Sequence, residues 1–130
     1  MYYNGSMIVG WFVTGSVLCG IGVILGAFGA HWLKDRLVAD MLVVFETGIR
    51  YHFIHAFGLF AVAWALSRWP SSWVGAAGWF FLVGIVLFSG SLYLLALTGE
   101  RWLGMITPIG GMILILGWMV LATGVFRGVS

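Results

Sequence analysis

Three long stretches of this chain carry no formally charged side chain, and this feature limits the folds open to it. They are residues 1–33, 69–99 and 102–126, and each is long enough for a membrane-spanning helix of about 20 residues. Only 8% of the 130 residues are charged and 62% are hydrophobic, whereas a soluble domain has roughly 25% charged residues. The excess apolar surface is therefore expected to face the lipid bilayer.

The chain is expected to form one all-α domain over residues 1–130, an integral membrane bundle of four transmembrane helices. Helices are expected because every backbone polar group in hydrocarbon must be satisfied inside its own segment. The expected spans are residues 7–30, 49–67, 73–97 and 108–126. Four spans place both termini on the same side of the membrane. No Lys or Arg precedes Lys34, so the first span does not resemble a cleaved signal peptide and is expected to be retained.

The links between these spans are short, except for residues 32–48. That link is expected to form a short interfacial amphipathic helix between the first and second spans, because its apolar residues recur close to helical spacing: Leu37, Met41, Leu42, Phe45 and Ile49. Gly99 suits a left-handed position at the end of the third span, and Thr107 suits a cap at the start of the fourth.

A helical wheel divides the polar groups around the second span between two faces. Glu46, Arg50 and Arg68 share one face with a stripe of aromatic residues: Phe53, Phe57, Phe60 and Trp64. Arg50 and Arg68 are 18 positions apart, or roughly 27 Å along a helix, which is close to the hydrocarbon thickness. The two arginines are therefore predicted to mark the membrane boundaries. Glu46 has the spacing to pair with Arg50.

His52 and His55 fall on the opposite face of this helix, among small residues, and are expected to point into the bundle. His55 lies roughly 7.5 Å deeper than Arg50 by helical rise. A buried imidazole needs hydrogen-bond partners, and polar groups at membrane depth are candidates for function.

Alternating helix direction is expected to bring most polar residues to one end of the bundle. They are His31, Lys34, Asp35, Arg36, Asp40, Glu46, Arg50, His52, His55, Glu100, Arg101 and Thr107. The polar cluster with the strongest claim to function comprises His31, Glu46, Arg50, His52 and His55. Counting Lys and Arg at the two ends favours a cytoplasmic polar end, and we expect the bacterial cytoplasmic membrane. No basic cluster is present, so nucleic acid is not an expected partner.

Small and aromatic residues add packing and anchoring predictions. Gly22, Gly26 and Ala30 recur at spacing four and are expected to form a small-residue ladder for packing within the bundle or between subunits. Ser89 and Ser91 are expected to make hydrogen bonds between helices. The predicted interfacial anchors are Arg50, Arg68, Trp69, Trp73 and Trp102.

Four motifs, in order along the chain, resemble a known family. They are LGAFGAH (residues 25–31), FETGIRYHFIHA (45–56), LFSGSLYLLALTG (87–99) and TPIGG (107–111). The sequence resembles the domain-of-unknown-function 423 family, small four-helix membrane proteins that include eukaryotic transmembrane protein 256. The resemblance covers nearly the whole chain and implies a four-helix membrane protein without an established activity. His31, Glu46, Arg50 and His55 match the family pattern, whereas glutamine is common at the position of His52 and glycine at that of Trp32.

The sequence favours a structural role over chemistry. No nucleophile motif, phosphate-binding loop or pair of acids is present, so neither an enzyme nor a cofactor is expected. We expect an accessory or structural subunit that packs against another membrane protein or forms a homo-oligomer. The alternative is proton or small-solute movement, with His55 and His52 as relay groups and Glu46 and Arg50 at the mouth. A metal site at His31, His52 and His55 is a weaker alternative, because no HExxH motif or cysteine pair accompanies them.

Overall fold

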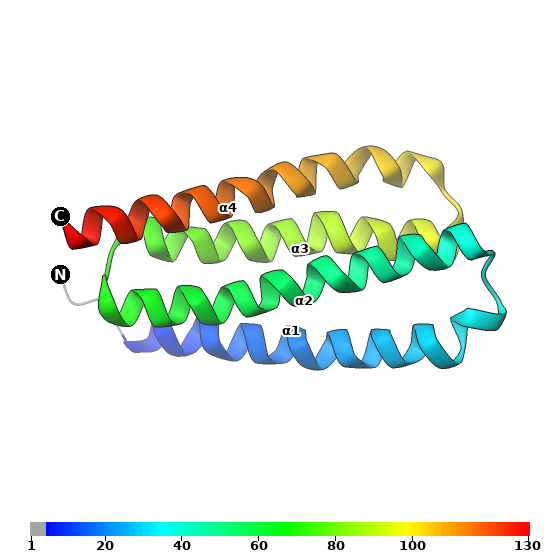
Figure 1. Ribbon diagram of the computed structural model, residues 1–130, viewed down its shortest axis with the longest axis horizontal. Helices are drawn as coiled ribbons and strands as arrows, with labels where there is room; N and C mark the ends of the chain where they lie inside the picture. Colours follow the sequence, from blue (N-terminus) through cyan, green and yellow to red (C-terminus); the bar gives the residue numbers. More distant parts are fainter. Residues whose placement is uncertain (1–4) are drawn as a thin grey trace.

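The computed structural model describes residues 5–130, which fold into four long helices joined by short links (Figure 1). The helices are α1 (Gly5–His31), α2 (Ala39–Arg68), α3 (Ser72–Thr98) and α4 (Ile106–Val129), with the short 3-10 helices η1 (Leu33–Asp35) and η2 (Arg101–Met105) in two of the links. Each of the four long segments is apolar and long enough to cross a membrane. The all-α class and the four membrane-spanning segments predicted from the sequence are confirmed.

The four helices lie side by side in chain order and alternate in direction (Figure 1). α2 and α3 occupy the middle, α1 packs mainly against α2, α4 packs mainly against α3, and α2 and α4 barely touch. The start of α1 and the end of α4 lie at one end of the array, while η1 and η2 lie at the other. The buried core is therefore centred on α2 and α3, and the outer helices expose long apolar faces.

The link between α1 and α2 differs from the prediction. Instead of a separate interfacial helix over residues 32–48, the structure has η1, and from Ala39 onward the chain already belongs to α2, which continues without a break to Arg68. Phe45 is 1% exposed and packs on Gly29 of α1, and Gly48 lies against Tyr93 of α3. Because α1 and α3 bury this stretch and no proline interrupts it, the helix continues instead of turning into the interface.

The helix ends follow local capping rules. Gly99 ends α3 in the left-handed conformation predicted for it, with φ of 73°. The Ser71 hydroxyl accepts the Val74 N–H at 3.1 Å and so caps the start of α3. The predicted cap at Thr107 is wrong: α4 begins at Ile106, so Thr107 lies inside the helix and its hydroxyl contacts α3 instead.

Close packing of α1 on α2 depends on glycines spaced seven residues apart. A Cβ at Gly15, Gly22 or Gly29 would lie 3.0 Å from the Ala56 carbonyl oxygen, 2.8 Å from the Phe53 ring and 2.9 Å from the Phe45 ring, respectively. The predicted ladder of Gly22, Gly26 and Ala30 is therefore split, because Gly26 has nothing within 4 Å of a Cβ and Ala30 is exposed. A repeat of seven keeps one helix seam against its neighbour, as in coiled coils.

Candidate functional site

His52 joins three helices through its two ring nitrogens. The side chain is 3% exposed, with Nε2 lying 2.7 Å from the Leu18 carbonyl oxygen of α1 and Nδ1 lying 2.9 Å from Tyr93 Oη of α3. Because a carbonyl oxygen can only accept, Nε2–H donates to Leu18, and in the neutral ring Nδ1 accepts the Tyr93 hydroxyl proton. The wheel prediction that His52 faces the bundle interior agrees with this position. Both polar atoms of the ring are thus satisfied inside the protein.

Two serines of α3 make further contacts between helices. Ser89 Oγ is fully buried and donates to the Gly48 carbonyl oxygen of α2 at 2.7 Å. Ser91 Oγ donates to the Phe88 carbonyl oxygen at 2.9 Å and lies 2.6 Å from Thr107 Oγ1 of α4. Such hydrogen bonds contribute about 0.6 kcal/mol each in membrane proteins. The serines therefore link α3 to the helix on each side of it.

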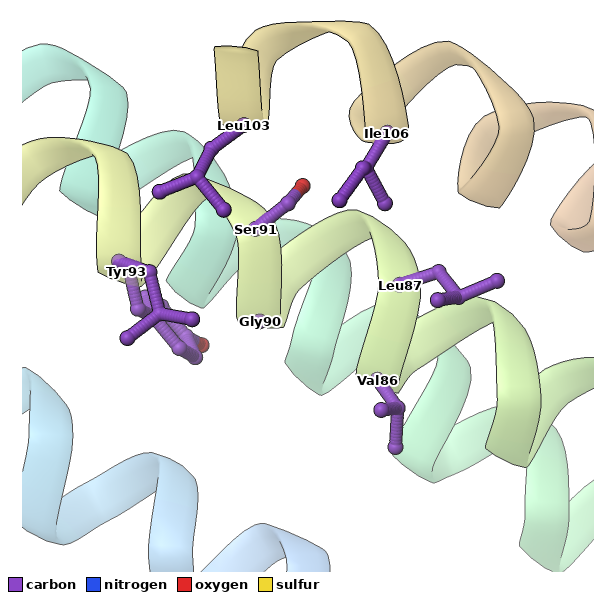
Figure 2. Close-up of a pocket in the computed structure, with 8 residues that line it drawn as sticks. Val86, Leu87, Gly90, Ser91, Tyr93, Leu103 and Ile106 are labelled. Atoms are coloured by element: carbon purple, nitrogen blue, oxygen red, sulfur yellow. The ribbon is translucent and has the colours of Figure 1, made fainter. Parts of the chain in front are cut away.

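An apolar notch of about 430 Å³ lies between α3 and the η2–α4 segment (Figure 2). Figure 2 shows Leu103 and Ile106 directed toward α3, with Ser91 pointing between them, while Tyr93 lies on the other side of the α3 ribbon. All eight lining residues are uncharged, and the Ser91 hydroxyl already has its partners. The notch therefore suits acyl chains better than a polar ligand.

His55 differs from His52 in its hydrogen bonding. Its side chain is 4% exposed, and Nδ1 donates to the Tyr51 carbonyl oxygen one turn earlier at 2.7 Å. The ring lies among the rings of Tyr51, Phe81 and Trp118, with centroid distances of 6.1, 5.6 and 5.9 Å. In the neutral ring Nε2 is an acceptor, and it has no hydrogen-bond partner among residues 5–130. His55 therefore retains hydrogen-bonding capacity that the protein does not use.

A groove of about 500 Å³ lies between α2 and α4, where these two helices barely touch. Its lining residues are Arg50, Tyr51, Ile54, His55, Phe88, Gly111, Leu114, Ile115 and Trp118. Arg50 is exposed, whereas most of the remaining wall is aliphatic or aromatic. The volume lies within the range of small-molecule sites, roughly 300–1,000 Å³. The groove combines one cationic side chain, one half-satisfied imidazole and an apolar wall.

The five residues of the predicted polar cluster do not form one site. His31 is exposed at the end of α1, Glu46 lines a small hollow beside α1, and Arg50 lines the groove beside α4. The predicted Glu46–Arg50 ion pair does not form in the part of the chain that the structure describes, because the two side chains line different hollows. His52 faces α1 and α3, whereas His55 faces α4.

Because these residues lie apart, the alternative of a metal site is also removed. Within residues 5–130, no group of three His, Cys, Asp or Glu side chains is placed to hold one metal ion. His52 already uses both ring nitrogens within the protein, and His31 and His55 lie in different surroundings. The three-histidine site suggested by the sequence is therefore not assembled.

The predicted interfacial anchors lie mostly at helix ends. Arg68 is the last residue of α2, and Trp69 packs edge-on against Trp64 with ring centroids 5.3 Å apart. The Arg127 guanidinium lies 4.9 Å from the centroid of the Trp73 ring, a cation–π distance. Trp102 is 57% exposed in η2. Arg50 differs from the others, because it lies well inside α2, the twelfth residue counted from Ala39.

Sequence reasoning missed three residues of these sites: Tyr51, Tyr93 and Trp118. A phenol hydroxyl within an apolar run is a usable signal, because a buried Tyr normally needs a hydrogen-bond partner, and this signal points to Tyr93. Trp118 carries no comparable signal. Its place beside His55 depends on how α4 is rotated against α3, which a single sequence does not specify.

The fold and its polar groups define a small helical integral membrane protein. The chain belongs to the family described as "Protein of unknown function (DUF423)", which it matches over residues 25–111, and the predicted family resemblance is confirmed. It is 44% identical over 115 residues to a UPF0382 membrane protein of Staphylococcus saprophyticus, covering 88% of this chain and 95% of that relative. No solved structure matches the chain.

Two further relatives come from well-separated bacteria. The UPF0382 membrane protein YwdK of Bacillus subtilis is 41% identical over 116 residues, which is 88% of this chain and 94% of YwdK. The UPF0382 inner membrane protein YgdD of Escherichia coli is 39% identical over 107 residues, which is 82% of each chain. These names support a membrane location for this chain and state no activity.

Proposed function

We propose that the protein is an accessory or structural subunit of the bacterial cytoplasmic membrane, with no catalytic role of its own, that packs against another membrane protein or a second copy of itself. The observation that carries this proposal is the uncovered outer face of α1. Of the 27 residues of α1, the buried ones are Trp11, Gly15, Gly22 and Gly29, which form the seam facing α2 and α3. Ile8, Leu18 and Leu25 pack partly against the core, and the exposed residues of the outer face are available to lipid or to a partner.

A small hollow on this side of the molecule gives the partner surface a location. Gly26 and Ala30 of α1 line it together with Phe45, Glu46 and Ile49 of α2, and its volume is about 150 Å³. Small residues let transmembrane helices approach closely, and packing of this kind drives their association in lipid. A helix from a partner fits against this hollow, with its polar atoms near the Glu46 carboxylate.

The orientation follows from the same arrangement. The start of α1 and the end of α4 share one end of the array, so both termini are proposed to lie on one side of the membrane. Lys34, Arg36 and Arg101 lie near the opposite end, in or beside η1 and η2. Lys and Arg are more frequent in cytoplasmic links, so this polar end is proposed to face the cytoplasm.

The test compares two leucine substitutions on α1. A Cβ at Gly26 or at Gly20 meets nothing within 4 Å, so neither Gly26→Leu nor Gly20→Leu begins with a clash at Cβ, and thermal unfolding of both variants checks that they fold. Gly26 lines the hollow and Gly20 does not. Purified from native membranes in a mild detergent and run on a native gel, wild type and Gly20→Leu should keep the partner, and Gly26→Leu should lose it. Recovery of the wild type only as a free monomer would contradict the proposal.

One observation favours a second candidate, proton or small-solute movement. The groove between α2 and α4 leads from exposed Arg50 to the buried His55 ring. His52, proposed from the sequence as a second relay group, is bonded to Leu18 and Tyr93, away from this groove. Flux measured across liposomes containing the purified protein tests this candidate. An unchanged flux in His55→Ala would count against it.

A further inference from the structure

We propose that the groove between α2 and α4 binds a lysophospholipid, with its phosphate at Arg50, its free glycerol hydroxyl at His55 Nε2 and its single acyl chain along the apolar wall. The site is separate from the α1 surface assigned above to a protein partner. A failure of this proposal would therefore leave the proposed accessory role unaffected, and a failure of the accessory role would leave this proposal unaffected.

The charge of the groove selects an anionic head group. Arg50 is the one lining residue with a permanent charge, and no acidic residue lines the groove. A guanidinium presents several N–H donors in a planar fork that matches phosphate oxygens. Arg50 is exposed, and its spacing from Arg68 predicts that it lies near a membrane boundary, which is the depth of lipid phosphates. A phosphate supplies the counter-charge that the groove lacks.

The imidazole selects a hydrogen-bond donor below that phosphate. Within the described residues, Trp11 Nε1 is the one buried side-chain nitrogen or oxygen that is both enclosed and without a partner. His55 Nε2 also lacks a partner, but protein atoms do not enclose it. It is therefore accessible from the groove that His55 lines. Since Nδ1 donates to the Tyr51 carbonyl oxygen, Nε2 of the neutral ring accepts, and it needs an O–H or N–H group.

This requirement separates lipid classes. A diacyl phospholipid has ester carbonyls just below its phosphate, and these can only accept hydrogen bonds. A lysophospholipid has a free hydroxyl on the glycerol carbon at that depth. Arg50 and His55 are five residues apart, or roughly 7.5 Å of helical rise, and although a helical wheel places them on different faces, both line the groove. The long, flexible arginine side chain can turn toward a phosphate there. The two protein groups thus match the two polar groups of one ligand.

The size of the groove favours one acyl chain. At the ~30 Å³ of a liquid water for each heavy atom, about 500 Å³ holds roughly sixteen heavy atoms, enough for the phosphate, the glycerol and the first carbons of one acyl chain. Ile54, Leu114 and Ile115 provide the aliphatic wall, and Trp118 lies against His55 at the deeper part. A second acyl chain would have to lie outside the groove in bulk lipid.

The experiment measures lipid binding to the purified full-length chain by native mass spectrometry in detergent. The probes are lysophosphatidic acid, its analogue without the free hydroxyl, and a diacyl phosphatidic acid. Wild type is expected to bind lysophosphatidic acid roughly fivefold more tightly than the deoxy analogue and the diacyl lipid, which is the range of one neutral hydrogen bond. This comparison needs no substitution in the protein.

Protein variants then assign the preference to named atoms. Arg50→Gln should weaken binding of both single-chain probes by roughly tenfold, because it removes a charge-assisted contact. Arg68→Gln, an exposed arginine at the other end of the same helix, is the matched control and should bind as wild type does. His55→Phe should abolish the preference for the hydroxyl while still binding the deoxy analogue. His55→Gln, which keeps an acceptor, should retain part of that preference.

Three results would overturn the assignment. Equal binding of the three lipids to wild type would show unselective contact with surrounding lipid. Equal loss of lipid binding in Arg50→Gln and Arg68→Gln would show that binding depends on the total positive charge and not on Arg50 in particular. A preference for the hydroxyl that survives His55→Phe would place the hydroxyl elsewhere. If His55→Phe fails to fold by circular dichroism, His55→Gln and the deoxy analogue still decide the question.

Discussion

Gly110 marks the closest approach of α3 and α4, and its replacement by alanine tests how these helices pack. A Cβ at Gly110 would clash with the Phe88 backbone nitrogen and lie 2.8 Å from both the Leu87 carbonyl carbon and Phe88 Cα. Comfortable contacts between carbon atoms are about 3.5–4.0 Å. The obstacle is backbone, which cannot rotate aside as a side chain can, so the two helices must separate by roughly 1 Å in Gly110→Ala.

The magnitude follows from two opposed effects. Forcing an extra methyl group into a packed interface costs about 1–3 kcal/mol, and the upper part of that range applies where the obstacle is backbone. Alanine in place of a helical glycine recovers about 1 kcal/mol. Gly110→Ala should therefore lower the free energy of unfolding by about 1–2 kcal/mol. The next residue is the control, because a Cβ at Gly111 would lie 3.5 Å from the Phe88 ring, an ordinary contact.

Gly111→Ala should thus leave the free energy of unfolding unchanged or raise it by up to about 1 kcal/mol. Both variants share the same chemical change at neighbouring positions of one helix, so the comparison cancels effects of composition. Equilibrium unfolding of the full-length chain in detergent micelles, followed by circular dichroism, measures both. Equal stability of the two variants, or a less stable Gly111→Ala, would refute the assigned rotation of α4 against α3.

Two further pairs of substitutions test single contacts in the same unfolding assay. Tyr93→Phe leaves the buried His52 Nδ1 without its donor and should lower the free energy of unfolding by about 1–2 kcal/mol. Tyr51→Phe, at a more exposed ring, is the control and should leave it unchanged. Equal values for the two variants would refute the His52–Tyr93 contact. Gly78→Ala drives a methyl group into the Trp11 ring and should destabilise the protein, but here the obstacle is a side chain, so adding Trp11→Leu should recover part of the loss. A double-mutant cycle without coupling between Gly78 and Trp11 would contradict that contact.

The number of helices and their approximate positions could be predicted because charge is so costly in hydrocarbon. An ionised side chain at the bilayer centre costs at least about 2.5–3.5 kcal/mol, so long uncharged runs indicate spans directly. The third span was expected at residues 73–97 and is Ser72–Thr98, and both of its ends have local capping signals in Ser71 and Gly99. Local chemistry alone specifies these boundaries.

The start of α2 could not be predicted in this way. The apolar spacing from Leu37 to Ile49 is the same for a helix lying in the interface and for one that continues into a span. What distinguishes them is burial of Phe45 on Gly29 and of Gly48 on Tyr93, which are contacts with two other helices. Such contacts depend on the tertiary arrangement, and no local pattern encodes them.

The small-residue seam shows the same limit. Spacing four was visible in Gly22, Gly26 and Ala30, yet the residues that pack against α2 are spaced by seven, at Gly15, Gly22 and Gly29. Twenty glycines in one chain supply many regular spacings by chance. The Phe53 and Phe45 rings of α2 select among them, and they can do so only once the two helices are side by side.

His52 and His55 illustrate how hydrogen bonding separates a structural role from a functional one. Both rings are buried in the same helix, and both were candidate relay groups from the sequence. His52 has a donor and an acceptor from α1 and α3, so any added ligand would have to displace a protein contact. His55 has one nitrogen bonded within its own helix and the other directed at a groove with a cation at its mouth. Because that nitrogen is accessible from the groove, a ligand can pair with it without displacing a protein contact. The polar groups of α2 therefore divide by residue: His52 holds the helices together, and His55 with Arg50 is where recognition should be sought.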